Sequence, residues 1–510
     1  MRPRNTLFLL LVLLALGGYV YWVELPSQKR EAEAKKLVAL DKATVTGVTL
    51  TYPDHTIALV KNPDGHWRLT QPVSADADDA VVNNLVTAVA EADVSRSLDD
   101  VGDKLASYGL APPDATVALT LKDGKPFPAI KVGKTTQVGN AAYVQKGDDP
   151  KVYIGTAAFQ SGMKKDVKDV RDKSMMTFED QDVQKLELAK ASTAITVERV
   201  DADRWRITAP ASYPADPAEI RALLASLRGV RAEDFVTDDP GADLGKFELM
   251  APQLKLSVWI GKDRAQKTLL IGGVKEEDKK KSLYAKRAEL PSVVTLPEYT
   301  LKNLDKSLTT LRDKTVVAFA KDQAAKIAVT RKDGAGFTLT KQDGAWHVVE
   351  PGEGTERGPT ITHFLDDVAS FKGTDIVAEG TQPDLGTFGL NAPELTIAVS
   401  DADGKPLGTL IGARGPKPTG DPDAIAYVAA TGGGVVYSVK PFVYDRIDKK
   451  LADFREKPRP TSSPSVAGPS PAAPAPAAVG APAGNTGAAA DPADDDDDDA
   501  NGEVDDGDNQ

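Results

Sequence analysis

The stretch YGLAPPDATVALTL at residues 108–121 decides how this chain should fold. Its first half is an aromatic turn that ends at Pro113, because proline drives the chain before it out of helical geometry. Its second half, residues 116–121, alternates apolar and polar side chains, as a strand with one buried face does. Leu105 stands three residues before Tyr108, so both side chains should lie on one face of a short helical turn. The stretch therefore predicts a helical turn that leads directly into a strand.

The same arrangement occurs twice more along the chain. In each copy an aromatic residue follows a leucine by three positions and precedes a proline by five. The later copies are Leu244, Phe247 and Pro252, then Leu385, Phe388 and Pro393. Tryptophans recur at intervals of about 140 residues, at Trp67, Trp205 and Trp346. Each follows a strand-like segment and a turn, so we expect each to lie on the second strand of a hairpin and to point into a core.

Other landmarks keep the same order in every copy. An amphipathic helix stands between the tryptophan and the aromatic turn, with apolar stripes at 82–89, 220–227 and 361–368. After the alternating strand come a strand ending in glycine, a tyrosine-bearing strand, a valine-rich strand and an amphipathic closing helix. The glycines are Gly133, Gly272 and Gly412, the tyrosines Tyr143, Tyr284 and Tyr427, and the closing arginines Arg171, Arg312 and Arg455. Such ordered self-similarity predicts tandem repeats.

Strands that follow one another through short turns favour antiparallel pairing, so the predicted fold class is α+β. We expect three tandem repeat units of mainly antiparallel sheet with helices. The units should span residues 44–176, 177–316 and 317–457. One transmembrane helix should precede them and a disordered acidic tail should follow them.

The N-terminal segment, residues 1–25, has the pattern of a membrane anchor. Arg2 and Arg4 precede an uncharged run at 6–23. A run of roughly 18 residues spans a hydrocarbon core of about 30 Å. The basic flank predicts a cytoplasmic N-terminus and an exported remainder. A cleaved signal peptide is the alternative, although the glycine and aromatic residues after the run form a poor cleavage site. Residues 26–43 are charged and should form a helical stalk.

The C-terminal segment, residues 458–510, is of another kind. It is rich in Pro, Ala, Gly and Ser and contains six consecutive aspartates at 494–499. Such a composition predicts disorder. It also holds most of the chain's net charge of −13, so the remaining chain is nearly neutral and has no basic excess for nucleic acid. The chain has no cysteine, which excludes disulfides and thiolate metal sites.

No catalytic, cofactor-binding or metal-binding residue emerges from the motifs. The four histidines lack metal-ligand spacing. A glycine–lysine–threonine sequence at 133–135 lacks the first glycine of a phosphate-binding loop, because that position is Pro128. Paired aspartates such as Asp78-Asp79 and Asp238-Asp239 fit helix starts and turns better than acid–base catalysis.

The residues that we single out are repeat landmarks: Trp67, Trp205, Trp346, Tyr108, Phe247, Phe388, Pro113, Pro252, Pro393, Arg171, Arg312 and Arg455. Core packing is the main interpretation of the aromatic residues and prolines, and a sugar or peptide surface is the alternative. The arginines should pin the closing helix to its sheet or to the next unit, or else mark a partner surface.

The aromatic turns, alternating strands, glycine turns and closing arginines together resemble the bacterial family called domain of unknown function 4340, over roughly residues 44–457. That resemblance implies location in the cell envelope and association with gliding-type ABC transport systems. It supplies no activity or catalytic residues. We therefore expect a non-enzymatic, membrane-anchored periplasmic scaffold or accessory protein whose partners are the inner membrane and an envelope complex of ABC permease or auxiliary subunits. The alternatives are a protein that binds cell-wall glycan or lipid, and a carboxylate-dependent hydrolase.

Overall fold

The computed structural model describes residues 36–99, 101–122, 124, 127–137, 141–350, 357–415 and 425–455, and the single positions 14, 16 and 22. The predicted anchor lies outside these residues apart from the three single positions. The predicted stalk up to residue 35 and the predicted acidic tail lie outside them as well. Among the helices of the described residues, none combines the length and the apolar character that crossing a membrane requires.

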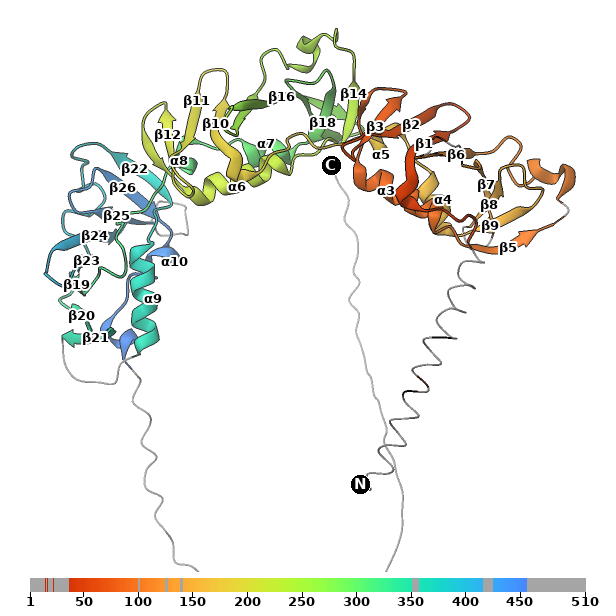
Figure 1. The fold of residues 1–510 in the computed structure, drawn as a ribbon. Coiled ribbons are helices and arrows are strands. Elements are labelled where there is room, and N and C mark those ends of the chain that lie inside the picture. Colours follow the sequence, from red (N-terminus) through yellow and green to blue (C-terminus); the bar gives the residue numbers. More distant parts are fainter. Residues whose placement is uncertain are drawn as a thin grey trace, which may run out of the picture. The chain divides into compact units, whose positions relative to one another are not determined.

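The strands form three sheets with one recurring strand order (Figure 1). The first has nine strands in the order β4-β3-β2-β1-β6-β7-β8-β9-β5. They are β1 (Val45–Thr51), β2 (Thr56–Lys61), β3 (Trp67–Gln71), β4 (Ala75–Asp76), β5 (Val94–Leu98), β6 (Ala115–Leu121), β7 (Ile130–Thr135), β8 (Ala142–Lys146) and β9 (Val152–Gly155). Every pairing is antiparallel.

The second sheet repeats this order as β13-β12-β11-β10-β15-β16-β17-β18-β14. Its strands are β10 (Val183–Ala189), β11 (Ala194–Arg199), β12 (Trp205–Ala209), β13 (Tyr213–Ala215), β14 (Asp234–Thr237), β15 (Leu254–Ile260), β16 (Ala265–Glu277), β17 (Lys280–Arg287) and β18 (Val293–Pro297). The third sheet follows as β21-β20-β19-β23-β24-β25-β26-β22. Its strands are β19 (Lys326–Arg331), β20 (Phe337–Gln342), β21 (Ala345–Glu350), β22 (Asp375–Glu379), β23 (Leu395–Ser400), β24 (Pro406–Arg414), β25 (Ala426–Ala430) and β26 (Val435–Val439). We call each sheet with its helices a unit.

One long helix packs on each sheet: α3 (Asp79–Ala90), α6 (Pro217–Arg228) and α9 (Gly358–Ala369). The residues buried on these helices are those of the predicted apolar stripes, with Ala90 added on α3. Shorter 3₁₀ helices are η2 (Lys42–Thr44), η3 (Gly102–Ala106), η4 (Asp180–Asp182) and η5 (Leu244–Phe247). The predicted mixture of antiparallel sheet and helix is therefore present, with sheet predominating.

The closing segment of each unit differs from the single helix that we predicted. It consists of two short helices: α4 (Ala157–Met163) and α5 (Val167–Val170), α7 (Tyr299–Leu304) and α8 (Leu308–Leu311), then α10 (Pro441–Tyr444) and η6 (Leu451–Phe454). The break has a local cause in the first two units, because Asp166 and Ser307 adopt extended backbone and cap a new helix with their side chains. Arg171 and Arg312 follow these helices in extended conformation, so neither is a helical residue.

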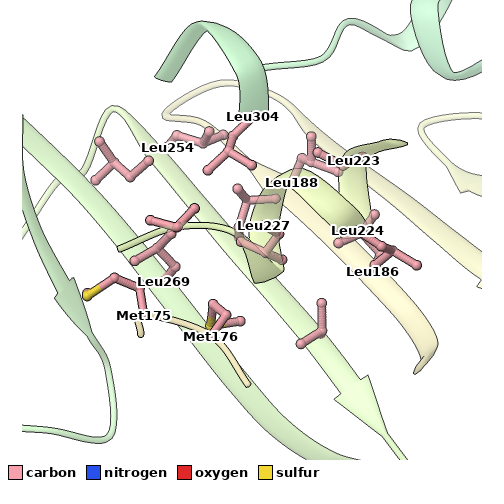
Figure 2. Packing of buried hydrophobic residues seen from close by; sticks show 14 of the residues in the cluster. Met175, Met176, Leu186, Leu188, Leu223, Leu224, Leu227, Leu254, Leu269 and Leu304 are labelled. Carbon is pink, nitrogen blue, oxygen red and sulfur yellow. The ribbon is translucent and has the colours of Figure 1, made fainter. Parts of the chain in front are cut away.

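The core of each unit lies between the long helix and one face of its sheet. Figure 2 shows the second core, where Leu223, Leu224 and Leu227 of α6 pack on strand leucines. Met175 and Met176 also belong to this core, so it begins before residue 177. Leu37 and Val38 pack on the first core, although we had assigned them to the stalk. The segment that enters each unit is thus held by its own buried apolar pair.

Candidate functional site: the aromatic turns and the joints between units

Each aromatic turn is held by a second ring from the tyrosine-bearing strand. The ring centroids of Tyr108 and Tyr143 lie 4.7 Å apart, and the same contact joins Phe247 to Tyr284 at 4.9 Å and Phe388 to Tyr427 at 5.0 Å. The rings are tilted by 58° to 60°, a favourable geometry for aromatic pairs. All six rings are half-buried. Pro113, Pro252 and Pro393 are half-buried too, each two residues before the next strand.

In the first two units the same close contact explains why the landmark is a glycine. In the third unit we had predicted the wrong residue for this position. A Cβ at Gly133 or Gly272 would lie 2.2 Å from the carbonyl oxygen of the preceding aromatic turn, which no side chain tolerates. The strand register places Ile271 opposite Leu254, but Gly412 opposite Leu395. The third-unit residue equivalent to Gly272 is therefore Ala413, and the sequence alignment of Gly412 was wrong by one position.

The three tryptophans are not equally covered. Trp67 and Trp205 are buried in their cores, whereas Trp346 is half-buried against the third core. The indole nitrogen of Trp67 donates to Asn83 on α3 at 3.0 Å, which satisfies its polar atom. Trp346 lies on β21, which forms one edge of the third sheet as far as the structure describes it. These positions place the tryptophans in packing roles.

The first joint, where the first unit meets the second, is centred on Arg171. Its backbone bridges to Ala77 of the first unit. Its side chain, only 5% exposed, reaches the second unit and donates two hydrogen bonds to Asp238, at 2.9 and 2.8 Å. The guanidinium also lies 3.5 Å from the ring centroid of Phe235. A two-pronged ion pair of this kind fixes orientation as well as distance.

The second joint, between the second and third units, is built in the same way around Arg312. Its backbone bridges to Ala215. Its side chain is 11% exposed and donates to both carboxylate oxygens of Glu379 in the third unit, each at 2.8 Å. The ring centroid of Tyr213 lies 3.7 Å from the guanidinium. The two joints therefore repeat the same cross-unit contact.

A second ion pair of opposite direction crosses each joint. Asp78 caps α3 and accepts from Arg231 of the second unit at 3.1 Å. Asp216 caps α6 and accepts from Lys372 of the third unit at 2.6 Å. At each joint, each of the two units supplies one basic and one acidic residue. Each of these four charges therefore meets an opposite charge from the other unit.

The pKa values of the acids respond to these contacts. Hydrogen bonds from Arg171 lower the pKa of Asp238, and those from Arg312 lower the pKa of Glu379. For Asp216, burial opposes ionisation, but hydrogen bonds from Lys372 and the Ala218 backbone outweigh it and the pKa is lowered. All three carboxylates are therefore stabilised in the charged form that the joint needs.

A cavity of about 460 Å³ opens at the first joint. Its walls include Arg68, Arg171, Arg287 and Phe235, together with Ala75. Ala75 pairs with Leu69 as Tyr213 pairs with Ile207, so the small Ala75 occupies the place of the Tyr213 ring. The hollow follows from this difference in side-chain size.

Arg455 occupies the third equivalent position. It follows η6 in extended conformation and is half-buried. The N–H of Arg357 donates to the Phe454 carbonyl at 2.9 Å, as Asp78 and Asp216 donate to Val170 and Leu311. Arg357 thus stands where the first two units have a capping aspartate.

The joint arginines were among the predicted landmarks, but their partners were not. Asp78 and Asp238 were interpreted as parts of aspartate pairs at helix starts and turns, and Glu379 was not singled out. Arg231 and Lys372 stand equally far from the starts of their helices, and this spacing is visible in the sequence. It points to a contact only when a joint between the units is already expected.

Other polar groups pair locally. His66 contacts Asp79 at 2.6 Å, and this hydrogen bond raises the pKa of the exposed imidazole. Asp366 and Asp367 of α9 pair with Lys321 and Arg446. Within the described ranges, no group of three metal-ligating side chains comes together.

Two exposed aromatic side chains lie at equivalent places. Tyr299 is 66% exposed at the start of α7, and Phe442 is 68% exposed at the start of α10. Each stands four residues after the strand residue that pairs with the repeated tyrosine. Tyr299 lines a hollow of about 380 Å³ beside the end of α6. Tyrosine is enriched among the residues that dominate binding energy at protein interfaces.

Comparison with known proteins identifies a family for this chain. The model of the domain of unknown function DUF4340 matches residues 67–204 and 205–393. The chain belongs to this family, since these two segments cover more than half of it. No curated protein matches the chain.

Two solved structures align along most of the chain. The DNA polymerase III subunit beta from Pseudomonas aeruginosa is 11% identical, with 81% of this chain and 98% of that one covered and a TM-score of 0.13. A eukaryotic initiation factor is 8% identical, with 78% and 96% covered and a TM-score of 0.10. TM-scores this low carry no argument about fold or function.

Proposed function

We propose that this protein is a non-enzymatic scaffold or accessory protein made of three tandem copies of the family domain. Residues 1–25 would anchor it in the bacterial inner membrane, with the units on the periplasmic side. Its partners would be ABC permease or auxiliary subunits of a gliding-like envelope transport system. The strand order that the eight strands of the third sheet share with the first two sheets supports the three copies, although the family model matches two segments.

The observation that carries the proposal is the pair of exposed aromatic residues, Tyr299 and Phe442, at one position of two consecutive units. Burying a large apolar side chain stabilises a complex by roughly 1.5–3 kcal/mol. Arg312 holds the second unit to the third through its ion pair with Glu379, so the two rings belong to joined neighbouring units. A repeated surface of this kind suits binding better than catalysis.

The test is a pull-down of the tagged full-length protein from its native membrane in mild detergent, with partners identified by mass spectrometry. We expect envelope permease or auxiliary subunits to co-purify, and to be lost from a Tyr299→Ser, Phe442→Ser double variant. Met250→Ser is the matched control, because Met250 is 77% exposed and lies away from both rings in the sequence. A deletion of residues 1–25 tests the anchor.

The result that would overturn the proposal is a preparation in which no envelope subunit rises above background. Retention of the same partners by the double variant would remove Tyr299 and Phe442 from the contact surface.

The cavity at the first joint favours one second candidate, a protein that binds glycan or lipid. Its wall combines the Phe235 ring with Arg68 and Arg287, and it also includes Asp76, Asp172 and Asp238. Such a lining suits a ligand with an apolar part and a polar or charged part. Titration of the full-length protein with anionic lipid, compared with an Ala75→Tyr variant that fills the cavity, tests this candidate directly.

A further inference from the structure

Both joints follow one charge rule. The outgoing face of a unit carries the residue before the long helix and the closing arginine, which are Asp78 and Arg171 in the first unit and Asp216 and Arg312 in the second. The incoming face of the next unit carries a base just beyond its long helix and an acid at or just beyond its outermost strand. These are Arg231 and Asp238 in the second unit and Lys372 and Glu379 in the third.

The incoming face of the first unit departs from this rule. Asp93 bridges to Lys36 as Arg231 bridges to Ser174 and as Lys372 bridges to Thr315. Asp93 is therefore the equivalent of the two bases. Asp99 follows Leu98, which pairs with Val152 as Thr237 pairs with Val293, so it is the equivalent of Asp238. Both side chains are exposed, and Asp99 pairs with the exposed Lys151 at 3.3 Å. This face presents two carboxylates.

The outgoing face of the third unit departs in the opposite sense. Arg455 keeps the place of Arg171, while the exposed Arg357 replaces the capping aspartate. At these two positions the face therefore carries two arginines, where each of the first two units carries an aspartate and an arginine. The described residues contain no sheet before the first or after the third, so neither face has a unit docked on it there.

We infer that these two faces bind each other in two copies of this chain, head to tail. Arg455 of one copy pairs with Asp99 of the next, as Arg171 pairs with Asp238 within the chain. Arg357 pairs with Asp93, which inverts the Asp78–Arg231 pair. The inversion makes the contact selective for the last face. If the outgoing face of the first unit docked there instead, the Asp78 carboxylate would meet the Asp93 carboxylate and repel it. A head-to-tail contact makes rings when its rotation closes and open chains when it does not.

The contact between copies is weaker than the joints within the chain. Ser97 pairs with Tyr153 as Phe235 pairs with Val294, so a serine stands in place of the ring under Arg171. The contact then rests on ion pairs in which Asp93, Asp99 and Arg357 are exposed, and salt screens such pairs. Association should therefore be reversible and should weaken as ionic strength rises.

The experiment measures the mass distribution of the full-length protein in mild detergent across concentration, by sedimentation velocity. We expect Asp93→Arg and Arg357→Asp each to weaken self-association by about tenfold, the ratio that corresponds to about 1.4 kcal/mol. Mixing the two variants should restore association between them, because the introduced arginine of one then meets the introduced aspartate of the other. Ser97→Phe should tighten association.

Both substitutions copy residues that the chain already uses at equivalent places, so the fold is expected to survive them. Arg357→Asp also gives α9 the capping residue that α3 and α6 have. Thermal unfolding of each variant checks this. A wild-type protein that stays monomeric at every concentration would overturn the inference. Association that neither variant weakens would overturn it too, and would indicate another occupant of the basic face, such as the chain's own acidic tail or a different protein.

Discussion

The first and second joints both place an aromatic ring against the joint arginine. The ring belongs to the incoming unit at the first joint and to the outgoing unit at the second. At the first joint the ring under the arginine is Phe235 of the incoming unit, opposite the small Ala75. At the second it is Tyr213 of the outgoing unit, and Ile376 stands in the place of Phe235. The arginine and its acid stay in place in both. Each joint therefore needs a base and an acid at the Arg171 and Asp238 positions. It also needs one aromatic ring at either the Ala75 or the Phe235 position.

Removing the joint arginine should have the largest effect. Arg171→Ala leaves the partly buried Asp238 carboxylate without its cation and with the Ser292 hydroxyl as its remaining donor, and we expect the free energy of unfolding to fall by about 2 kcal/mol. Arg312→Ala should cost about 1 kcal/mol, because Glu379 is 39% exposed and Asp238 is 30% exposed.

Urea unfolding followed by tryptophan fluorescence measures both values. Arg228→Ala is the matched control, since its pair with Asp180 is exposed and lies within one unit. An Arg171→Ala variant no less stable than this control would show that the joint contributes nothing.

Exchanging the rings tests whether volume is shared between the two positions. Phe235→Ile should destabilise the first joint by about 1 kcal/mol through lost apolar burial. Adding Ala75→Tyr makes the first joint resemble the second and should recover part of that loss. The same urea titration measures it. If Ala75→Tyr destabilises the Phe235→Ile protein further, the two positions do not compensate each other.

Acid should loosen the joints. The pKa of Asp238 is lowered by the hydrogen bonds of Arg171, so its contribution is complete above the unfolded-state value of about 4. The contribution is lost as pH falls through the lower folded-state pKa. The stability difference between wild type and Arg171→Ala should therefore shrink below about pH 4. A difference that stays constant from pH 7 to pH 3 would contradict this.

The reversed ion pairs should matter least. Arg231→Gln should change the free energy of unfolding by about 0.5 kcal/mol or less, because the Arg231 side chain is 53% exposed. Lys372→Gln should cost slightly more, since the Asp216 side chain is only 7% exposed. Both effects should fall in high salt. Equal losses in low and high salt would point to packing by the side-chain stems.

Local sequence patterns predicted much of each unit because their causes are local. The spacing of Leu244, Phe247 and Pro252 specifies a turn followed by a strand. The alternation of the next strand shows which side chains face the core. The helix stripes are the buried faces of α3, α6 and α9. The closing helix was the exception, because caps at Asp166 and Ser307 divide a segment whose apolar pattern is continuous.

Contacts between units could not be read from those patterns. Arg171 and Asp238 stand 67 positions apart, as Arg312 and Glu379 do, and no helix or strand periodicity connects residues at that separation. The third glycine was assigned one residue early because only strand pairing shows that Ala413 lies beside the aromatic turn. Equivalence between such positions is a property of the register between strands.

The sequence by itself determined the recurring landmarks, the antiparallel units and the family, because turn chemistry and apolar periodicity act over a few neighbouring residues. The tertiary structure alone decided which acid each joint arginine meets, which side supplies the ring, and that the joint positions hold two aspartates on the first face and two arginines on the last. Those features depend on side chains that are brought together only after separate sheets have formed and packed.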